Sequence, residues 1–203
     1  MTTFVLIRHA SHARLGRAIV GRAPGVPLSP EGMREAEVLT ERLGASSIQA
    51  IYSSPLERAR ATAGPLAARL HLEVQIAEEL NEIDYGAWTN RTLAELHDLE
   101  EWRRFNAFRS GSRIPGGETM VEVQERMLRL AERLCSAHPD RGIALISHGD
   151  VIKATLAYYL GVSLDLFQRI EISPGSVSIV RIERYGPEVL LINGGVEEQR
   201  LQA

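Results

Sequence analysis

The sequence predicts a single α/β domain, a three-layer sandwich in which a mostly parallel, doubly wound sheet carries helices on both faces. The main observation is a pattern that occurs three times: a short apolar segment, then polar residues, then an amphipathic helical segment. The length of 203 residues gives no reason to divide the chain into two domains. With 44% hydrophobic and 24% charged residues, the composition is that of an ordinary globular protein.

The first strand and helix occupy the N-terminal part of the chain. Residues 4–7 are apolar and stop at two basic residues, which is typical of a buried parallel strand. Residues 11–28 contain three glycines and two prolines without a clear period, so we expect a loop that arches over the strand end. Ser29-Pro30 provides an N-cap and a proline at the first helical position, and Gly44 closes the predicted helix.

The second strand and helix follow directly. Ile48–Tyr52 predicts another buried strand, and Ser54-Pro55-Leu56-Glu57 fits a capping box at the start of a helix. Gly64-Pro65 should kink this helix or end it early, because proline cannot donate the helical hydrogen bond.

The middle of the chain, residues 71–116, shows little regular pattern. It contains a short apolar run at Val74–Ile76 and a predicted helix over Thr92–Phe108. We expect a segment at about 83–116 to cover the site as a cap.

The C-terminal part supplies the third strand and the end of the sheet. Glu118–Ala137 has the clearest helical period of the chain, and Ile143–Ile146 predicts a buried strand. A helix is expected over about Val151–Leu160, with a glycine as its stop. Val177–Ile182 and Val189–Ile192 predict a closing hairpin or a last pair of strands.

Polar residues follow each of the three predicted strands, and in a doubly wound sheet ligands bind beyond these strand ends. The residues are Arg8-His9, then Ser53-Ser54 with Arg58, then Ser147-His148-Gly149. Two guanidinium groups, two imidazoles and the backbone N–H groups of helix N-termini suit a phosphoryl dianion. The sequence therefore predicts a phosphate pocket.

A neutral imidazole such as His9 can act as a nucleophile and split one phosphoryl displacement into two steps. Neighbouring arginines would disfavour the imidazolium form and neutralise charge on the phosphoryl oxygens. The leaving group also needs a proton donor, for which a buried carboxyl group of raised pKa is suited. The residues themselves do not select this group from the 26 acidic side chains.

These motifs, taken in order, resemble the histidine phosphatase superfamily, which includes the cofactor-dependent phosphoglycerate mutases. The resemblance spans nearly the whole chain. The matching elements are Leu6-Ile7-Arg8-His9, Gly21-Arg22 before Pro27-Leu28-Ser29 and Gly32, Tyr52-Ser53-Ser54-Pro55-Leu56-Glu57-Arg58-Ala59 with Thr62-Ala63, Leu80-Asn81-Glu82 with Tyr85-Gly86 and Trp88, Pro115-Gly116-Gly117-Glu118, and Ser147-His148-Gly149.

The resemblance implies a phosphoglycerate mutase-like fold and a phosphoric monoester hydrolase of the histidine acid phosphatase type. It makes His9 the phospho-acceptor and Glu82 the proton donor, and it assigns Arg8, Arg58 and His148 to the phosphate pocket, with Arg8 and His148 also taking part in catalysis. It implies no metal and no cofactor. The expected substrate is a phosphorylated small molecule, and the expected product is inorganic phosphate.

The chain departs from the family pattern in two places. Ala10 stands where the family usually has glycine, which would cost about 1–2 kcal/mol if the position needs a positive φ. The run Ser11-His12-Ala13-Arg14-Leu15-Gly16 lacks the usual asparagine that touches the phosphoryl group. Ser11, Arg14, Arg17 or Arg22 could supply replacement donors, and we count Ser11, Arg22 and Gly149 among the candidate substrate-binding residues.

The sequence also allows other interpretations. His9 and His12 have a spacing that metal ligands can show, although no carboxylate partner is obvious nearby. A phosphoglycerate mutase shares the chemistry, and a catalytically weak phospho-ligand binding module would need no acid. Aromatic residues at Trp88, Trp102, Phe105 and Phe108 could line a substrate pocket, but near-helical spacing more often indicates packing.

Composition excludes several function classes. A net charge of −3 gives no sign of nucleic-acid or membrane binding. One cysteine allows no internal disulfide and fits a reducing compartment. No signal peptide and no apolar run of membrane-spanning length is apparent, so we expect a cytoplasmic protein. Oligomeric state is open, a homodimer included.

Overall fold

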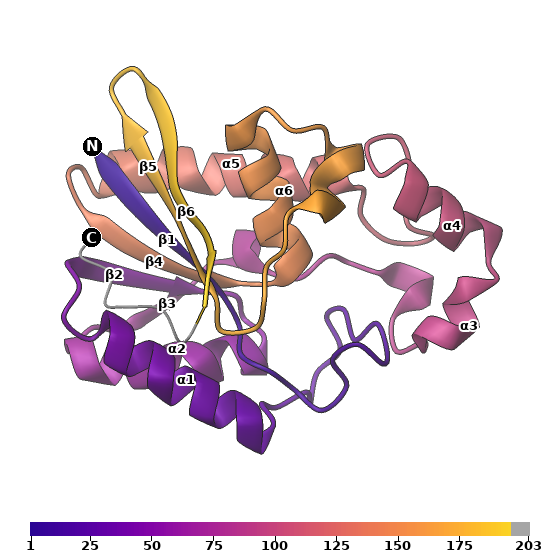
Figure 1. Cartoon of the computed structure of the whole chain (residues 1–203), viewed down its shortest axis with the longest axis horizontal. Coiled ribbons are helices and arrows are strands. Elements are labelled where there is room, and N and C mark those ends of the chain that lie inside the picture. Colours follow the sequence, from indigo (N-terminus) through magenta and orange to yellow (C-terminus); the bar gives the residue numbers. More distant parts are fainter. Residues whose placement is uncertain (196–203) are drawn as a thin grey trace.

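A computed structural model describes residues 1–195, which form one six-stranded sheet with helices on both faces (Figure 1). The spatial strand order is β3-β2-β4-β1-β5-β6. The strands are β1 (Thr2–Arg8), β2 (Ile48–Ser53), β3 (Val74–Ile76), β4 (Gly142–Ser147), β5 (Val177–Glu183) and β6 (Gly186–Gly194). The first four are parallel, whereas β5 runs antiparallel to β1 and to β6. This confirms the predicted fold class, although residues 196–203 of the predicted domain lie outside the described residues.

Two pairs of helices enclose the sheet, α1 and α2 on one face and α5 and α6 on the other (Figure 1). The α-helices are α1 (Pro30–Leu43), α2 (Glu57–Leu70), α3 (Leu93–His97), α4 (Glu100–Ala107), α5 (Met120–Ala137) and α6 (Gly149–Leu160). Short 3-10 helices are η1 (Glu78–Leu80), η2 (Gly86–Trp88) and η3 (Leu164–Arg169).

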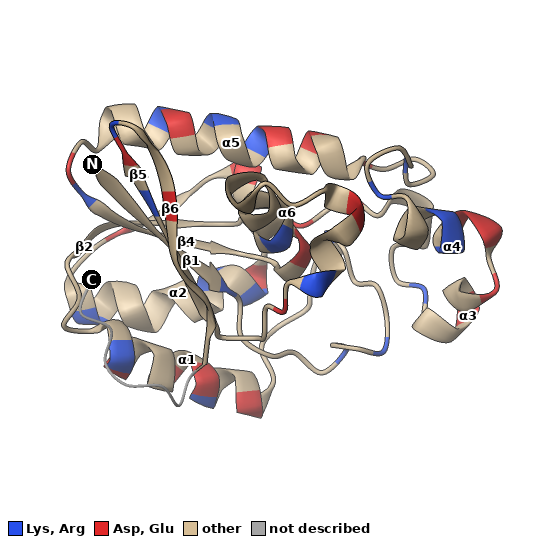
Figure 2. Cartoon of the chain, turned by 45° about the horizontal axis from the view of Figure 1, so that its top comes forward, with Lys and Arg blue, Asp and Glu red and all other residues tan. Residues whose placement is uncertain are grey.

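Successive side chains of the central strand β1 point to opposite faces of the sheet. Because helices cover both faces, both sets of side chains are buried. Phe4 and Leu6 belong to the core under α5 and α6, whereas Val5 and Ile7 pack with α1 and α2. Charged residues lie mainly on the helices and loops, for example along α1 and α5, while β2 and β4 carry none (Figure 2). Within residues 1–195, no helix is both long and apolar enough to cross a membrane.

The helix α2 differs from the prediction at its start and in its middle. Its N-cap is Leu56, without a side-chain cap, so the expected capping box from Ser54 does not form. The helix also continues through Pro65 to Leu70. Pro65 and Ala61, whose carbonyl loses its partner, are both exposed, so water can satisfy that carbonyl.

The single helix predicted over Thr92–Phe108 is wrong in its continuity, because α3 and α4 are separate helices. Leu96 and Phe105 are both buried in the same core. On an uninterrupted helix, a separation of nine residues at about 100° each amounts to roughly two and a half turns. The two side chains would then point to opposite sides of the helix. The break at Asp98-Leu99 lets both side chains face inward.

Candidate active site

The carboxyl ends of β1, β2 and β4 meet at one edge of the sheet. The parallel register pairs Arg8 with Ser147, and the His9 N–H donates to the Ser147 carbonyl at 2.9 Å. His9 and His148, which are far apart in sequence, therefore lie with ring centroids 5.0 Å apart. Arg58 reaches the same place from the first turn of α2.

His9 is held as a neutral ring with a defined tautomer. Its Nδ1–H donates to the carbonyl oxygen of Ala10 at 2.8 Å, which leaves the lone pair on Nε2. The Arg58 Nε–H donates to that lone pair at 3.2 Å. Burial, and then the charges of Arg58 and Arg8, keep the pKa of His9 well below its usual value. A neutral imidazole whose unprotonated nitrogen lies beside a guanidinium group can act as a nucleophile toward phosphorus.

Arg58 also determines the tautomer of His148. Its Nη2 donates to the Gly21 carbonyl at 2.9 Å and lies 3.3 Å from His148 Nδ1. Because a guanidinium group only donates, Nδ1 accepts, and the Nε2–H of His148 donates to Ser54 Oγ at 2.9 Å. This bond occupies the hydroxyl that was expected to cap α2. Burial, and then the charge of Arg58, lower the pKa of His148 well below its usual value.

The carboxyl group of Glu82 faces Arg58 and the neutral ring of His148. Its Oε2 lies 3.6 Å from His148 Nδ1 and 3.9 Å from Arg58 Nη2. Burial raises the pKa of Glu82, while Arg58 and a hydrogen bond from the Ile83 N–H partly oppose the shift. A carboxyl group of raised pKa beside an anion site is suited to give a proton and later to take one.

A cavity of about 230 Å³ opens next to these residues. Its polar floor contains Arg8, His9 and Glu82, and Gly149 lies beside Arg8. A Cβ atom at Gly149 would come within 3.2 Å of the Arg8 guanidinium group, so a side chain there would crowd the arginine. The rest of the lining is His12, Leu15, Gly16, Ala18, Ile19, Val20, Gly21, Tyr85, Leu93, Asp150 and Lys153.

Two loops join to form one wall of this cavity. Ala18 and Thr92 form an antiparallel bridge. Backbone N–H groups of Ile19, Asn90 and Leu93 donate to Arg91, Ile19 and Arg17 carbonyls at 2.9, 2.7 and 3.1 Å. Residues 17–19 and 90–93 are therefore paired like two short strands. The predicted covering segment at 83–116 contributes Tyr85 and Leu93 to the lining.

Six of the predicted site residues come together, namely Arg8, His9, Arg58, Glu82, His148 and Gly149. Ser11 and Arg22 are not brought into the cavity lining. The Ser11 N–H and hydroxyl both donate to the Glu35 carboxylate at 2.7 Å. Arg22 turns away from the cavity toward Glu118 and the backbone of Glu82. Both residues therefore serve to hold loops in this structure.

The departure at Ala10 carries no backbone strain. Ala10 is not among the residues with positive φ, and it is completely buried. Its N–H donates to Thr62 Oγ1 at 3.0 Å. The cost that a positive φ would impose on alanine therefore does not arise.

Sequence reasoning missed several cavity residues, among them the buried His12. Its ring centroid lies 5.5 Å from that of His9, and its Nδ1 finds no hydrogen-bond partner among residues 1–195. Burial, and then Arg58, lower the pKa of His12 to about 4. The described residues contain no group of three or more side chains suited to hold a metal ion.

Tyr85, Asp150 and Lys153 were also missed. Lys153 follows Gly149 by one helical turn, and this spacing on α6 was the available signal. Asp150 accepts from Arg109 at 3.1 Å and from the Tyr85 hydroxyl at 3.4 Å. Of the aromatic residues considered as pocket lining, three pack with one another: Trp88 lies 5.3 Å from Trp102 and 5.5 Å from Phe105 between ring centroids. Phe108 is exposed.

Comparison with known proteins agrees with this geometry. The family model described as the histidine phosphatase superfamily (branch 1) matches residues 4–194. Phosphoserine phosphatase 1 of Hydrogenobacter thermophilus is 29% identical over 198 residues, 95% of this chain and 92% of that protein. A probable phosphoglycerate mutase GpmB of Proteus mirabilis is 33% identical over 203 residues, 98% of this chain and 92% of that protein. The structure of Bacillus stearothermophilus YhfR superposes with a TM-score of 0.90 at 25% identity, covering 96% and 98% of the two chains.

Proposed function

The chain belongs to the histidine phosphatase superfamily, and from this premise we propose that it hydrolyses phosphomonoesters of small molecules through a phosphorylated His9. One observation carries the proposal: His9 is buried and neutral, and its unprotonated Nε2 lies against Arg58 beside a cavity that Arg8 and Glu82 also line. The narrower assignment to the histidine acid phosphatase type stays a prediction, because the matching family model is that of branch 1.

The first chemical step forms the covalent intermediate. His9 Nε2 attacks phosphorus, the bond between phosphorus and the ester oxygen breaks, and Glu82 gives its proton to the departing oxygen. Arg8 and Arg58 neutralise charge on the phosphoryl oxygens.

The second step releases inorganic phosphate. Glu82, now a carboxylate, takes a proton from a water molecule, whose oxygen attacks phosphorus while the bond to His9 Nε2 breaks. The ring and the carboxyl group then have their starting protonation states. The wall formed by residues 17–19 and 90–93 supports a covering role for the segment at 83–116, because it closes one side of the cavity.

Small phosphomonoesters that carry a carboxylate are the substrate class that the cavity favours. Its volume of about 230 Å³ suits a small ester. Among the described residues that line it, Arg8 and Lys153 are the only cations, and Lys153 is also the only lysine of the chain. A phosphoryl group beside Arg8 would place a second anionic group near Lys153. Phosphoserine and phosphoglycerate, after which two relatives are named, both carry such a carboxylate.

The test compares phosphoserine, phosphoglycerate and β-glycerol phosphate, which has no carboxylate, as substrates in excess EDTA. We expect phosphate release that is lost in His9→Ala, and an acid-labile phosphoenzyme after rapid quenching of the wild type. Lys153→Met should raise KM about tenfold for the carboxylated esters only. Full activity of His9→Ala contradicts the proposed nucleophile, and an equal effect of Lys153→Met on all three esters contradicts the substrate class.

The same preparation separates the competing functions. A mutase keeps the phosphoryl group on histidine until a second hydroxyl accepts it, so phosphoglycerate primed with the bisphosphate would isomerise without release of phosphate. A binding module would bind phosphate with no turnover of any ester. Either result would overturn the proposal of a phosphatase.

A further inference from the structure

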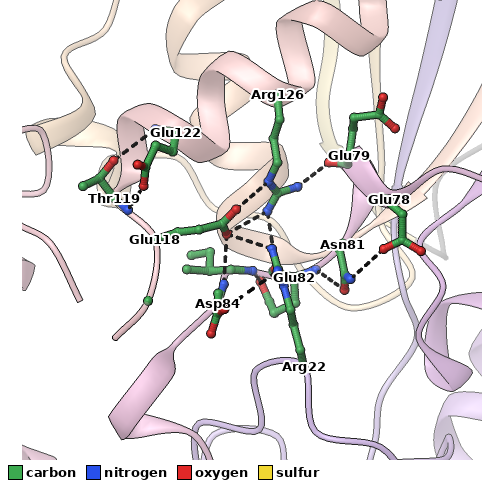
Figure 3. A network of polar contacts seen from close by, with 12 residues as sticks. Arg22, Glu78, Glu79, Asn81, Glu82, Asp84, Glu118, Thr119, Glu122 and Arg126 are labelled. Carbon is green, nitrogen blue, oxygen red and sulfur yellow. Dashed lines mark hydrogen bonds and ion pairs between the residues drawn. The ribbon is translucent and has the colours of Figure 1, made fainter. Parts of the chain in front are cut away.

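Two arginines and one glutamate surround the backbone of the proposed acid (Figure 3). Arg22 comes from the loop at 11–28, Glu118 precedes α5, and Arg126 lies on α5. Both arginines donate to the carbonyl oxygen of Glu82, Arg22 Nε at 2.8 Å and Arg126 Nη2 at 3.3 Å. We call these three residues the acid clamp.

Glu118 holds the clamp together and extends it along the chain. Its Oε2 lies 3.0 Å from Arg22 Nη2, and its Oε1 accepts from Arg126 Nε at 3.2 Å. Glu118 Oε2 also accepts from the Asp84 N–H at 2.9 Å, and the Glu118 N–H donates to the Asp84 carbonyl at 3.0 Å. The backbone is therefore bound at Glu82 and again at Asp84 (Figure 3).

The clamp is also linked to Arg58, because Arg22 directly follows a residue that Arg58 binds. Gly21, the neighbour of Arg22, lines the cavity and accepts from Arg58 Nη2 at 2.9 Å. The two residues 21–22 thus bind Arg58 through the backbone and Glu82 through the side chain. The position of the acid and that of the phosphoryl group are set from the same point of the chain.

We propose that the acid clamp is a positioning device, which sets the distance between the Glu82 carboxyl group and the oxygen that leaves phosphorus. This inference rests on the proposed function. Arg22, predicted from the sequence to bind substrate, acts through Glu82 and does not touch the ester. Displacing a catalytic group by about 1 Å can cost about a hundredfold in rate, so loosening the backbone of Glu82 impairs proton donation.

The leaving group provides a readout that a general loss of structure does not imitate. p-Nitrophenolate leaves as a stable anion and needs little help from an acid, whereas the alkoxide of β-glycerol phosphate needs the proton. The ratio kcat/KM covers the steps through phosphoryl transfer to His9 and omits hydrolysis of the intermediate. In Arg22→Gln we expect it to fall about 10- to 100-fold for β-glycerol phosphate. For p-nitrophenyl phosphate we expect a change of less than about threefold.

Two further variants strengthen the experiment. Glu118→Gln should show the same selective loss, and Arg22→Lys, which keeps a cation and a donor, should recover part of it. The side chain of Arg22 is 35% exposed, so Arg22→Gln should fold even where the buried part of the clamp tolerates no change. Thermal unfolding of each variant verifies this.

Glu122→Gln is the matched control. Glu122 lies one turn along from Glu118, where it caps Thr119 and pairs with exposed Arg113, and glutamine preserves the cap. Glu122→Gln should leave kcat/KM unchanged for both substrates. Glu82→Gln is the reference for the acid itself, and if it shows no dependence on the leaving group, the proposed acid role fails. Suppose that Glu82→Gln shows that dependence, while Arg22→Gln lowers kcat/KM equally for both substrates or for neither. The positioning inference alone is then overturned.

Discussion

Replacing Ala10 by glycine introduces the residue that the family usually has next to the proposed nucleophile, and the structure predicts that this change weakens the fold. The Ala10 side chain is completely buried, and its backbone has no positive φ that glycine would relieve. The hydrogen bond from its N–H to Thr62 uses the backbone and survives the substitution. Glycine therefore removes packing and relieves nothing.

The magnitude has two parts. Losing one buried methyl group costs about 0.8 kcal/mol of hydrophobic burial. The extra freedom of glycine in the unfolded chain adds about 0.4–1 kcal/mol. The sum is about 1.2–1.8 kcal/mol, which corresponds to a fall in Tm of roughly 2–7 °C for a chain of this size.

Calorimetric or circular-dichroism melting of Ala10→Gly and the wild type measures this shift. Ala13→Gly is the control, because Ala13 is exposed in the same loop and should show only the smaller entropic part. Since Ala10 is not part of the cavity lining, kcat/KM of Ala10→Gly should stay within about threefold of the wild type. An unchanged or higher Tm would refute the unstrained backbone, and a tenfold gain in activity would show that the methyl group obstructs the site.

Three further predictions concern charge. Because burial raises the pKa of Glu82 and the acid must be protonated, kcat/KM for alkyl phosphates should fall as pH rises above that pKa; a pH–rate profile of Glu82→Gln should lack this limb. The pKa of His9 is lowered in the folded state, so its contribution to stability is present above about pH 6.5 and is lost, by at most about 1.4 kcal/mol per pH unit, as pH falls. Urea unfolding of His9→Asn should be less sensitive to acid, and equal sensitivity would contradict the buried neutral ring. Arg109→Ala leaves Asp150 without its buried cation and should lower the free energy of unfolding in urea by about 3 kcal/mol. A loss of less than about 1 kcal/mol would contradict a stabilising ion pair.

The cluster of two arginines and two histidines at the strand ends was predictable because it depends on topology and on local chemistry. Any two neighbouring parallel strands bring their carboxyl ends together, so Arg8-His9 and Ser147-His148 had to meet once both strands were recognised. Arg58 in a helical first turn had an electrostatic reason to face an anion. These inferences needed no knowledge of distant contacts.

The rest of the site depends on contacts that local sequence does not encode. Ser11 has the right chemistry for a phosphate donor, but Glu35, 24 residues later, takes both its N–H and its hydroxyl. Arg22 is likewise drawn to Glu118 by packing of the chain. Glu82 lies in an irregular loop, where only the family resemblance distinguished it from other carboxylates.

The predictions for the start and the middle of α2 were wrong for related reasons. Ser54 was expected to cap a helix, but a buried histidine competes for the same hydroxyl. Pro65 was expected to disturb α2, but it falls on the solvent side, where the freed carbonyl is hydrated at little cost. In both cases the tertiary environment of one residue outweighs its local preference.

The pairing of residues 17–19 with 90–93 has a consequence for any effort to redesign specificity. Each loop presents its backbone groups to the other, so the two form a composite unit that tolerates separate side-chain changes but little separate change of length. Grafting one loop from a relative would leave mismatched edges, whereas exchanging both preserves their register. New substrate preferences on this scaffold should therefore be sought by swapping the two loops as a pair.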